Sequence, residues 1–93
     1  LLPTMLSEEG HVWHLFVIRS SRRDDLQKYL AEKGIQTLIH YSIPPHKQQA
    51  YKEYNKLSFP ITENTHKSVL SLPISAIIND LELEKIVRAI NKF

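Results

Sequence analysis

The stretch HVWHLFVIRSSRRDDLQKYLAEKG, residues 11–34, decides the expected fold because its hydrophobic pattern changes period part-way along. Residues 11–19 are rich in β-branched and aromatic side chains, and both alternating faces of this stretch carry apolar groups. This pattern predicts a central strand that is buried on both sides. In residues 22–33 the apolar side chains recur at helical spacing, which predicts a helix soon after the strand.

The helix expected over residues 22–33 has sequence signals at both ends. Ser21, with Asp24 three residues later, is a pattern typical of an N-cap, and Asp25 adds negative charge at the positive end of the helix. Gly34 stands where the residue after a helix often takes a positive φ. These signals predict where the helix begins and ends.

Outward from this unit, the sequence predicts a second strand and three further helices. Residues 35–41 form the expected strand, which the following prolines end because proline donates no hydrogen bond to a sheet. The later elements are a helix over residues 45–54, a short helix over 60–69, an extended stretch over 70–73 and a last helix capped by Asn79 with Glu82. The expected buried stripe of the last helix comprises Leu83, Ile86, Val87 and Ile90. The order β-α-β-α-α-β-α predicts the α/β class, as an α+β sandwich with a few-stranded sheet packed against helices.

The composition is that of an ordinary one-domain globular protein and excludes several kinds of chemistry. The 93 residues are 42% hydrophobic and 24% charged, and the formal net charge of +2 is too small to imply a nucleic-acid partner by itself. Cysteine is absent, which excludes disulfides, Fe–S clusters and thiol chemistry and fits a reducing cytoplasm. No apolar run approaches the roughly 18 residues needed to cross a membrane, and no secretory signal pattern is present.

The start of the chain favours a piece of a longer polypeptide. The first residue is Leu1, and the only methionine is Met5. We therefore expect a domain cut from a larger protein, in which residues 1–9 are an incoming loop or linker.

The segment TLIHYSIPPH, residues 37–46, is the strongest candidate for a functional site. His40 and Tyr41 end the expected second strand, and two prolines stiffen the chain before His46. Titratable side chains held by a stiff loop at a strand end are common in binding sites. A structural interpretation stays open, in which His40 is a core histidine and Tyr41 and His46 are surface residues.

Other catalytic or metal-binding patterns are weak. His11 and His14 would point to opposite faces of a strand, so a structural zinc site is not expected. The chain has two glycines and no glycine-rich phosphate loop. Paired acidic residues stand at expected helix starts, where capping explains them better than acid–base catalysis does.

Three segments taken together resemble a known enzyme family. They are HVWHLFVIR (11–19), GIQTLIHYSIPPHKQQAY (34–51) and FPITENTHKSVLSLPI (59–74), followed by an amphipathic helix ending at Phe93. Their order and spacing resemble those of the DegT/DnrJ/EryC1/StrS sugar aminotransferases over about residues 10–93. Each segment alone is a weak signal, and the combination is specific.

The resemblance implies a fold and a cofactor. Enzymes of this family are similar in fold to aspartate aminotransferase, of fold type I. A large domain holds pyridoxal 5′-phosphate as a Schiff base on a lysine, and a small carboxy-terminal domain closes one side of the site. Residues 10–93 are expected to be that small domain. The lysine would then lie upstream, so no catalytic residue is expected in this chain, which would be inactive alone.

The resemblance also implies a reaction and its setting. The full-length enzyme would be a cytoplasmic homodimer that transfers an amino group, from glutamate, to a nucleotide-linked keto-deoxy sugar. Its product would serve lipopolysaccharide or another cell-surface polysaccharide, or a related glycan. Neither a nucleic acid nor a membrane is an expected partner.

Individual residues take expected roles from the same resemblance. His40 and Tyr41 match the family's His-Tyr pair near the sugar and cofactor, and His46 matches a second histidine beyond the proline bend. Ser42 departs from the proline that often follows the pair, which suggests the hypothesis of a sub-branch that uses a 3-keto rather than a 4-keto sugar. Arg19, at the end of the first expected strand, could hold a carboxylate or phosphate of a ligand, but pairing with Asp24 or Asp25 is the favoured expectation.

Two other functions stay open on the sequence. The first is a standalone α/β binding module for RNA or protein, because Arg22, Arg23, Lys28 and Lys33 fall on one expected helix. A recognisable pattern of sheet aromatics for base stacking is missing. The second is a purely structural or dimerisation domain.

Overall fold

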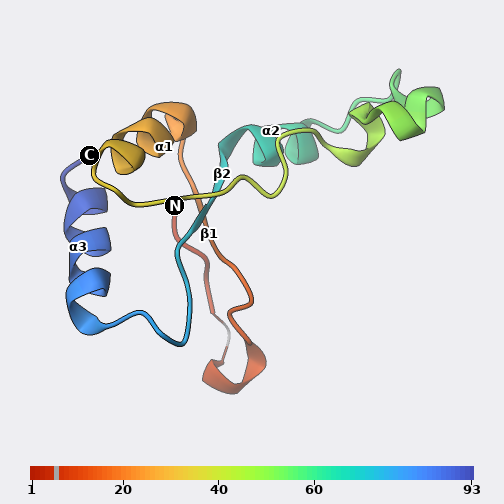
Figure 1. Ribbon diagram of the computed structural model, residues 1–93. Helices are drawn as coiled ribbons and strands as arrows, with labels where there is room; N and C mark the ends of the chain where they lie inside the picture. The colour runs from red at the N-terminus through yellow and green to blue at the C-terminus, as the bar shows by residue number, and fades with distance from the viewer. Residues whose placement is uncertain (6) are drawn as a thin grey trace.

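Two short strands pair antiparallel at the centre of the computed structural model, which describes residues 1–5 and 7–93 (Figure 1). Phe16 of β1 lies opposite Leu72 of β2, and Arg19 lies opposite Val69. The elements in chain order are η1 (Glu8–Gly10), β1 (Phe16–Arg19), α1 (Arg23–Glu32), η2 (Pro45–Lys47), η3 (Gln49–Tyr54), α2 (Pro60–Ser68), β2 (Val69–Leu72) and α3 (Asp80–Asn91), where η is a 3₁₀ helix.

One hydrophobic core joins this sheet to α1 and α3. Leu30 of α1 and Leu70 of β2 are fully buried. The core cluster consists of Ile18, Leu26, Leu30, Ile35, Leu70, Ile86 and Ala89. The apolar periodicity of α1 therefore serves packing against β2, as the sequence indicates.

The first strand is shorter than expected, and the expectation of a strand over residues 11–19 that is buried on both sides is wrong. β1 begins at Phe16, and Val12 is 90% exposed. The strand does not extend back through Trp13, because the φ of +47° at this residue is outside the extended region. Within the described residues the sheet has two strands, so the apolar face of residues 11–15 finds no strand to cover it.

The expectation of a second strand over residues 35–41 is also wrong. This segment is extended, but it makes a single bridge to the sheet, where Leu38 and Ser71 exchange backbone hydrogen bonds of 3.1 and 2.7 Å. The chain then turns at Tyr41 and enters the proline bend. One bridge is enough to hold this segment against β2 without making it a strand.

The expected helices are found, but the N-cap of α1 and the helix type of residues 45–54 differ from expectation. α1 ends as expected, and Gly34 has a φ of +72°. The N-cap of α1 is Arg22 rather than Ser21, and the Arg22 N–H donates to the hydroxyl of Ser20 instead. The expected helix over residues 45–54 is two 3₁₀ helices, because Gln48 between them has an extended backbone.

The last two helices follow the sequence closely. α2 starts at Pro60, and α3 has a complete capping box formed by Asn79 and Glu82. In the expected stripe of α3, Ile86 is buried and Ile90 packs on the core, whereas Leu83 and Val87 are exposed. The buried stripe is therefore narrower than expected, since two of its four members are exposed.

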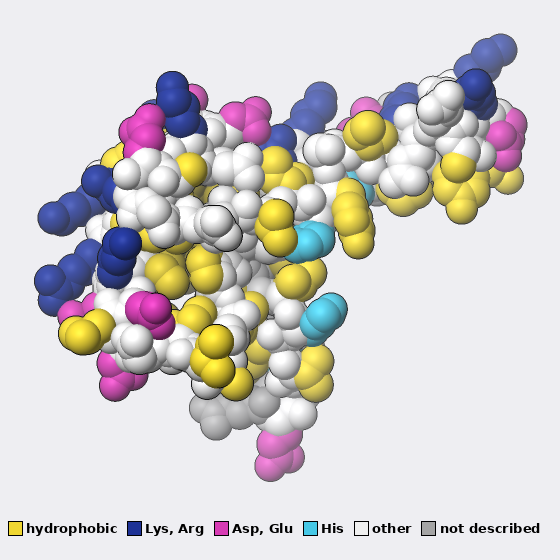
Figure 2. Space-filling model, in the orientation of Figure 1, with side chains coloured by type: hydrophobic (Ala, Val, Ile, Leu, Met, Phe, Trp, Pro, Cys, Tyr) yellow, Lys and Arg dark blue, Asp and Glu magenta, His cyan; other side chains and the backbone are white. Residues whose placement is uncertain are grey.

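Residues 45–59 form a projection that we call the arm, which extends away from the sheet and α1 (Figure 1). The Cα radius of gyration is 15.4 Å, against about 12 Å for a compact domain of this length. Every side chain from residue 49 to 61 is exposed, including Tyr51 and Tyr54, and Figure 2 shows hydrophobic side chains along the arm. Among the described residues, no helix is long and apolar enough to cross a membrane.

Candidate functional site

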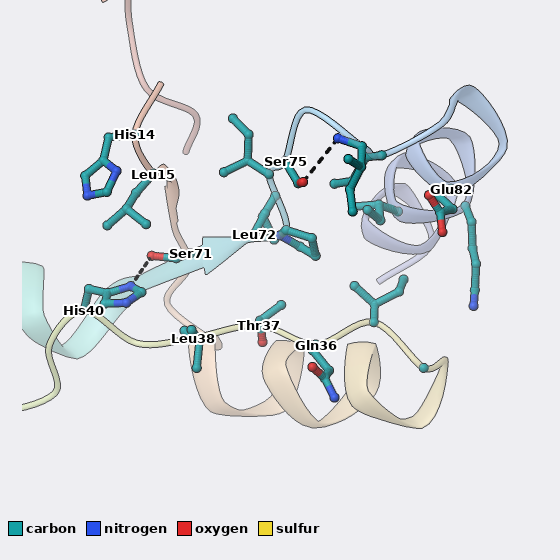
Figure 3. Close-up of a pocket in the computed structure, with 18 residues that line it drawn as sticks. His14, Leu15, Gln36, Thr37, Leu38, His40, Ser71, Leu72, Ser75 and Glu82 are labelled. Atoms are coloured by element: carbon teal, nitrogen blue, oxygen red, sulfur yellow. Dashed lines mark hydrogen bonds between the residues drawn. The ribbon is translucent and has the colours of Figure 1, made fainter. Parts of the chain in front are cut away.

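A hollow of about 700 Å³ lies between the extended segment 35–40, the end of β2 and the start of α3 (Figure 3). Its wall combines aliphatic and polar side chains. The polar side chains on the wall include His14, His40, Ser71, Glu82 and Lys85. In ligand sites, apolar walls bury the ligand and polar groups fix its orientation.

His40 lies on the wall of this hollow with its ring held from one side. Its Nδ1 is 2.9 Å from the hydroxyl of Ser71, as the dashed line in Figure 3 shows. Ser71 is 4% exposed and its backbone is fixed by the bridge to Leu38. Ser71 engages Nδ1, and among the described residues Nε2 has no hydrogen-bond partner, so this nitrogen is available for a further hydrogen bond.

Tyr41 follows His40 but lies outside the hollow. Its side chain is 66% exposed, and its ring meets the ring of His40 edge-on at 5.5 Å between centroids. The Tyr41 carbonyl accepts a 2.6 Å hydrogen bond from Nδ1 of His66 on α2. The structure therefore brings the two side chains of the pair together and leaves the Tyr41 phenol accessible.

His46 is separated from this pair. Its side chain is 7% exposed, and its Nε2 donates to Oε1 of Glu63 at 3.0 Å. The ring also meets Phe59 edge-on, with 4.9 Å between centroids. His46 is thus neither a surface residue nor part of the hollow, and its expected approach to a ligand stays a prediction.

Glu63 is the residue near the bend whose ionisation the fold alters. The Phe59 N–H donates to Oε1 of Glu63 at 3.0 Å, and His46 donates to the same oxygen. The hydrogen bond from the Phe59 N–H holds the pKa of Glu63 below its ordinary value, and the hydrogen bond from His46 lowers it further. Burial of the carboxyl group raises this pKa, and the positive charge of Lys47 lowers it. Since Glu63 is ionised at neutral pH, the proton in the contact with His46 sits on the imidazole.

Arg19 does not pair with Asp24 or Asp25, contrary to expectation. Its Nε donates to the hydroxyl of Ser68 at 2.9 Å. The two acidic residues instead pair with the arginines that begin α1, Asp25 with Arg22 and Asp24 with Arg23. Arg19 lies at the end of β1, where Ser68 precedes its strand partner Val69, so the serine is nearer than the helix start.

The row of cations on α1 is largely engaged within the helix. Arg22 and Arg23 are in the ion pairs just described, and the Lys33 ammonium lies 4.6 Å from the centre of the Tyr29 ring. Intramolecular partners of this kind weaken the basis for an RNA-binding surface on this helix.

Three functional candidates were missed by sequence reasoning. They are Ser71, which contacts His40, Glu63, which contacts His46, and His66, which contacts the carbonyl of Tyr41. Ser71 is a hydroxyl within the otherwise aliphatic β2, and Glu63 stands four residues after Phe59 in the first turn of a helix that Pro60 opens. These signals are visible in the sequence, but their partners are set by tertiary contacts. His66 has no local signal at all.

The sequence and the fold are also similar to those of known proteins. Residues 1–91 match the model of the DegT/DnrJ/EryC1/StrS aminotransferase family. The chain belongs to this family. The expected family and fold class, an α/β part of a fold-type-I aminotransferase, are both confirmed.

Two curated members of the family illustrate the sequence likeness. The dTDP-3-amino-3,6-dideoxy-alpha-D-galactopyranose transaminase of Aneurinibacillus thermoaerophilus is 54% identical over 92 residues, 99% of this chain and 25% of the relative. The dTDP-3-amino-3,4,6-trideoxy-alpha-D-glucose transaminase of Streptomyces venezuelae is 35% identical over 94 residues, again 99% of this chain and 25% of the relative. The chain spans about a quarter of the length of these relatives.

Solved structures of family members agree with the fold. The S. venezuelae DesV structure in complex with a ketimine intermediate has a TM-score of 0.90 and 35% identity, over 98% of this chain and 25% of DesV. The Bacillus subtilis NtdA structure with bound cofactor PMP has a TM-score of 0.85 and 34% identity, over 98% of this chain and 22% of NtdA. The short sheet and its helices are therefore part of the aminotransferase architecture.

Proposed function

We propose that the intact protein is an aminotransferase that moves an amino group, from glutamate, to the keto group of a nucleotide-linked deoxy sugar. Residues 10–93 are its small carboxy-terminal domain, after an incoming loop over residues 1–9. The observation that carries the site is the placement of His40 on the wall of the hollow, held by buried Ser71, with the exposed Tyr41 beside it.

The residues present fit one edge of a pyridoxal phosphate site. The exposed phenol of Tyr41 and the free edge of the His40 ring are suited to oxygen atoms of a cofactor or sugar. Family membership supports placing the phosphate site and the Schiff-base lysine in the upstream part of the protein. Pyridoxal phosphate, when bound, supplies the electron sink for amino transfer.

The side chains of this chain bind and orient the sugar. The His40 ring is fixed by Ser71, so a hydrogen bond from its opposite edge has a defined direction. The Tyr41 phenol offers a second hydrogen bond to a hydroxyl or phosphate oxygen. The aliphatic part of the hollow, with Leu15, Leu72 and Ile78, excludes water from one side of the bound molecule.

The position aminated is proposed to be C3 of the sugar. Two relatives that match across nearly the whole chain are named as transaminases of dTDP-linked 3-amino sugars. Ser42, which stands where proline often follows the His-Tyr pair, fits a branch of the family that takes a 3-keto sugar.

The setting of the reaction is part of the same proposal. The full-length protein is a cytoplasmic homodimer, and its amino sugar serves a polysaccharide of the cell surface, such as lipopolysaccharide, or a related glycan. The family membership supports this setting, and solution size together with the fate of the sugar in a deletion strain would test it.

The experiment that tests the function uses the full-length gene product. The purified protein should show the absorbance of bound pyridoxal phosphate and should aminate a dTDP-linked 3-keto-6-deoxy sugar when glutamate is present. The matched control is the same assay with the 4-keto isomer, which should react more slowly. A full-length product without a Schiff-base lysine upstream, or without amination of either sugar, would overturn the proposal.

A further inference from the structure

The bend that carries His40 and Tyr41 is held by one continuous segment of the chain. The three contacts run in reverse order along the two segments: Ser71 to His40, His66 to Tyr41 and Glu63 to His46. The distances between the bonded atoms are 2.9, 2.6 and 3.0 Å. Residues 63–71 thus contact residues 40–46 in antiparallel order and hold them at three points.

Two of these contacts come from the same side of α2. Glu63 and His66 are three residues apart, which places them on one face of the helix. Their partners, His46 and Tyr41, stand at the two ends of the bend. We call this pair of contacts the α2 clamp. A loop bonded at both ends to a rigid helix has far fewer conformations than one that is bonded at a single end.

The clamp also fixes the base of the arm. Oε1 of Glu63 accepts from His46 where the chain enters the arm and from the Phe59 N–H where the chain leaves it. Lys47 donates to the carbonyl oxygens of Asn55 and Leu57 at 2.7 and 2.9 Å, which closes the arm on itself. A shift of the arm is therefore transmitted through Glu63 to the bend.

We propose that Glu63 and His66 are positioning residues, which act on the reaction through the bend and do not touch the substrate. This inference rests on the proposed role of His40 and Tyr41. His66 binds the backbone carbonyl of Tyr41 and so fixes the backbone orientation from which the Tyr41 side chain projects. Glu63 holds the far end of the same bend through the buried ring of His46.

The test uses the full-length enzyme with two measurements on each variant, kcat/KM for amination and hydrogen–deuterium exchange of peptides. Loss of one internal hydrogen bond predicts a fall in kcat/KM of about five- to tenfold in His66→Ala and in Glu63→Ala. Exchange should rise in peptides covering residues 40–48 and stay unchanged in peptides of α1. General destabilisation would instead raise exchange in both.

Conservative variants and a control separate positioning from folding. His66→Asn should restore activity and protection, because its amide nitrogen takes the place of Nδ1 as a donor to Tyr41. Glu63→Gln keeps an acceptor for Phe59 or His46 and should lie between wild type and Glu63→Ala. Lys67→Ala, at an exposed position on the same helix, should behave as wild type.

The outcomes distinguish this inference from the function on which it rests. Wild-type kinetics and exchange in both alanine variants, together with a large loss in His40→Asn, would overturn the positioning role and leave the proposed function standing. Full activity in His40→Asn and Tyr41→Phe would overturn the proposed function and the positioning role together.

Discussion

The imidazole of His40 and the hydroxyl of Ser71 lie 2.9 Å apart, across a sequence separation of 31 residues. Ser71 is buried in β2, so its position is set by the core and not by solvent. The bridge of Leu38 to the backbone of Ser71 brings the two side chains into register. The candidate site is thus attached to β2, which contributes the fully buried Leu70 to the core.

Substitution of Ser71 by alanine should loosen the His40 ring without unfolding the protein. One hydrogen bond is lost, so we expect kcat/KM for amination to fall about five- to tenfold and the free energy of unfolding to fall by about 1 kcal/mol. Steady-state kinetics and denaturant unfolding of the full-length enzyme measure both. Ser58→Ala, at an exposed position of the arm, is the control and should change neither. An unaltered kcat/KM in Ser71→Ala would show that this contact does not orient the ring for the reaction.

Acid should weaken the hold of Glu63 on the bend. The folded pKa of Glu63 lies below its unfolded pKa, so its contribution to stability is complete above the unfolded value and is lost as the pH falls through the folded value. The thermal midpoint of wild type should exceed that of Glu63→Gln at neutral pH, and the difference should shrink in the acid range below the ordinary carboxyl pKa. A difference that stays constant, or that grows with acid, would contradict the assigned hydrogen bonds.

Truncation of the core should have the largest effect on stability. Leu30→Ala removes a fully buried side chain that packs in the same core cluster as Leu70 and Ile86, and we expect a loss of about 3 kcal/mol. Denaturant unfolding measures it, with Lys28→Ala on the same helix as the control. A loss below about 1 kcal/mol would mean that the site can collapse or is not in the core as described.

Position 34, just beyond the C-cap of α1, requires glycine because of its backbone conformation and not because of the space around it. Gly34 has a φ of +72°, and a Cβ there would lie 3.6 Å from the flexible end of Lys85, which is an ordinary contact. We therefore expect Gly34→Ala to cost about 1 kcal/mol of folding free energy from the left-handed backbone alone. Gly34→Asn should cost less, because asparagine tolerates this conformation better. Equal stability of the alanine variant and wild type would contradict the backbone assignment.

Local signals in the sequence predicted the three α-helices, although they missed the N-cap of α1 and the 3₁₀ character of residues 45–54. The spacing of Leu26 and Leu30 placed α1 in the core, and the Asn79–Glu82 capping box is present as expected. These features depend on residues within one or two turns of each other, which is why a sequence can reveal them.

The strands and the site contacts depend on partners elsewhere in the chain. The apolar alternation of residues 11–15 gave no sign that the pairing would end at Phe16 and Leu72. The motif identified the bend, but the burial of His46 follows from Glu63 and Phe59, and the hold on Tyr41 follows from His66. Such pairings are fixed by tertiary packing, which no local pattern encodes.

The most direct test of the central claim is the kcat/KM of full-length His40→Asn for glutamate-dependent amination of the dTDP-linked 3-keto sugar. We expect a fall of tenfold or more with a thermal midpoint close to that of wild type, because the ring proposed to meet the sugar is lost while the core is intact. Wild-type kcat/KM at an unchanged thermal midpoint would contradict it and would leave His40 as a structural residue of the hollow.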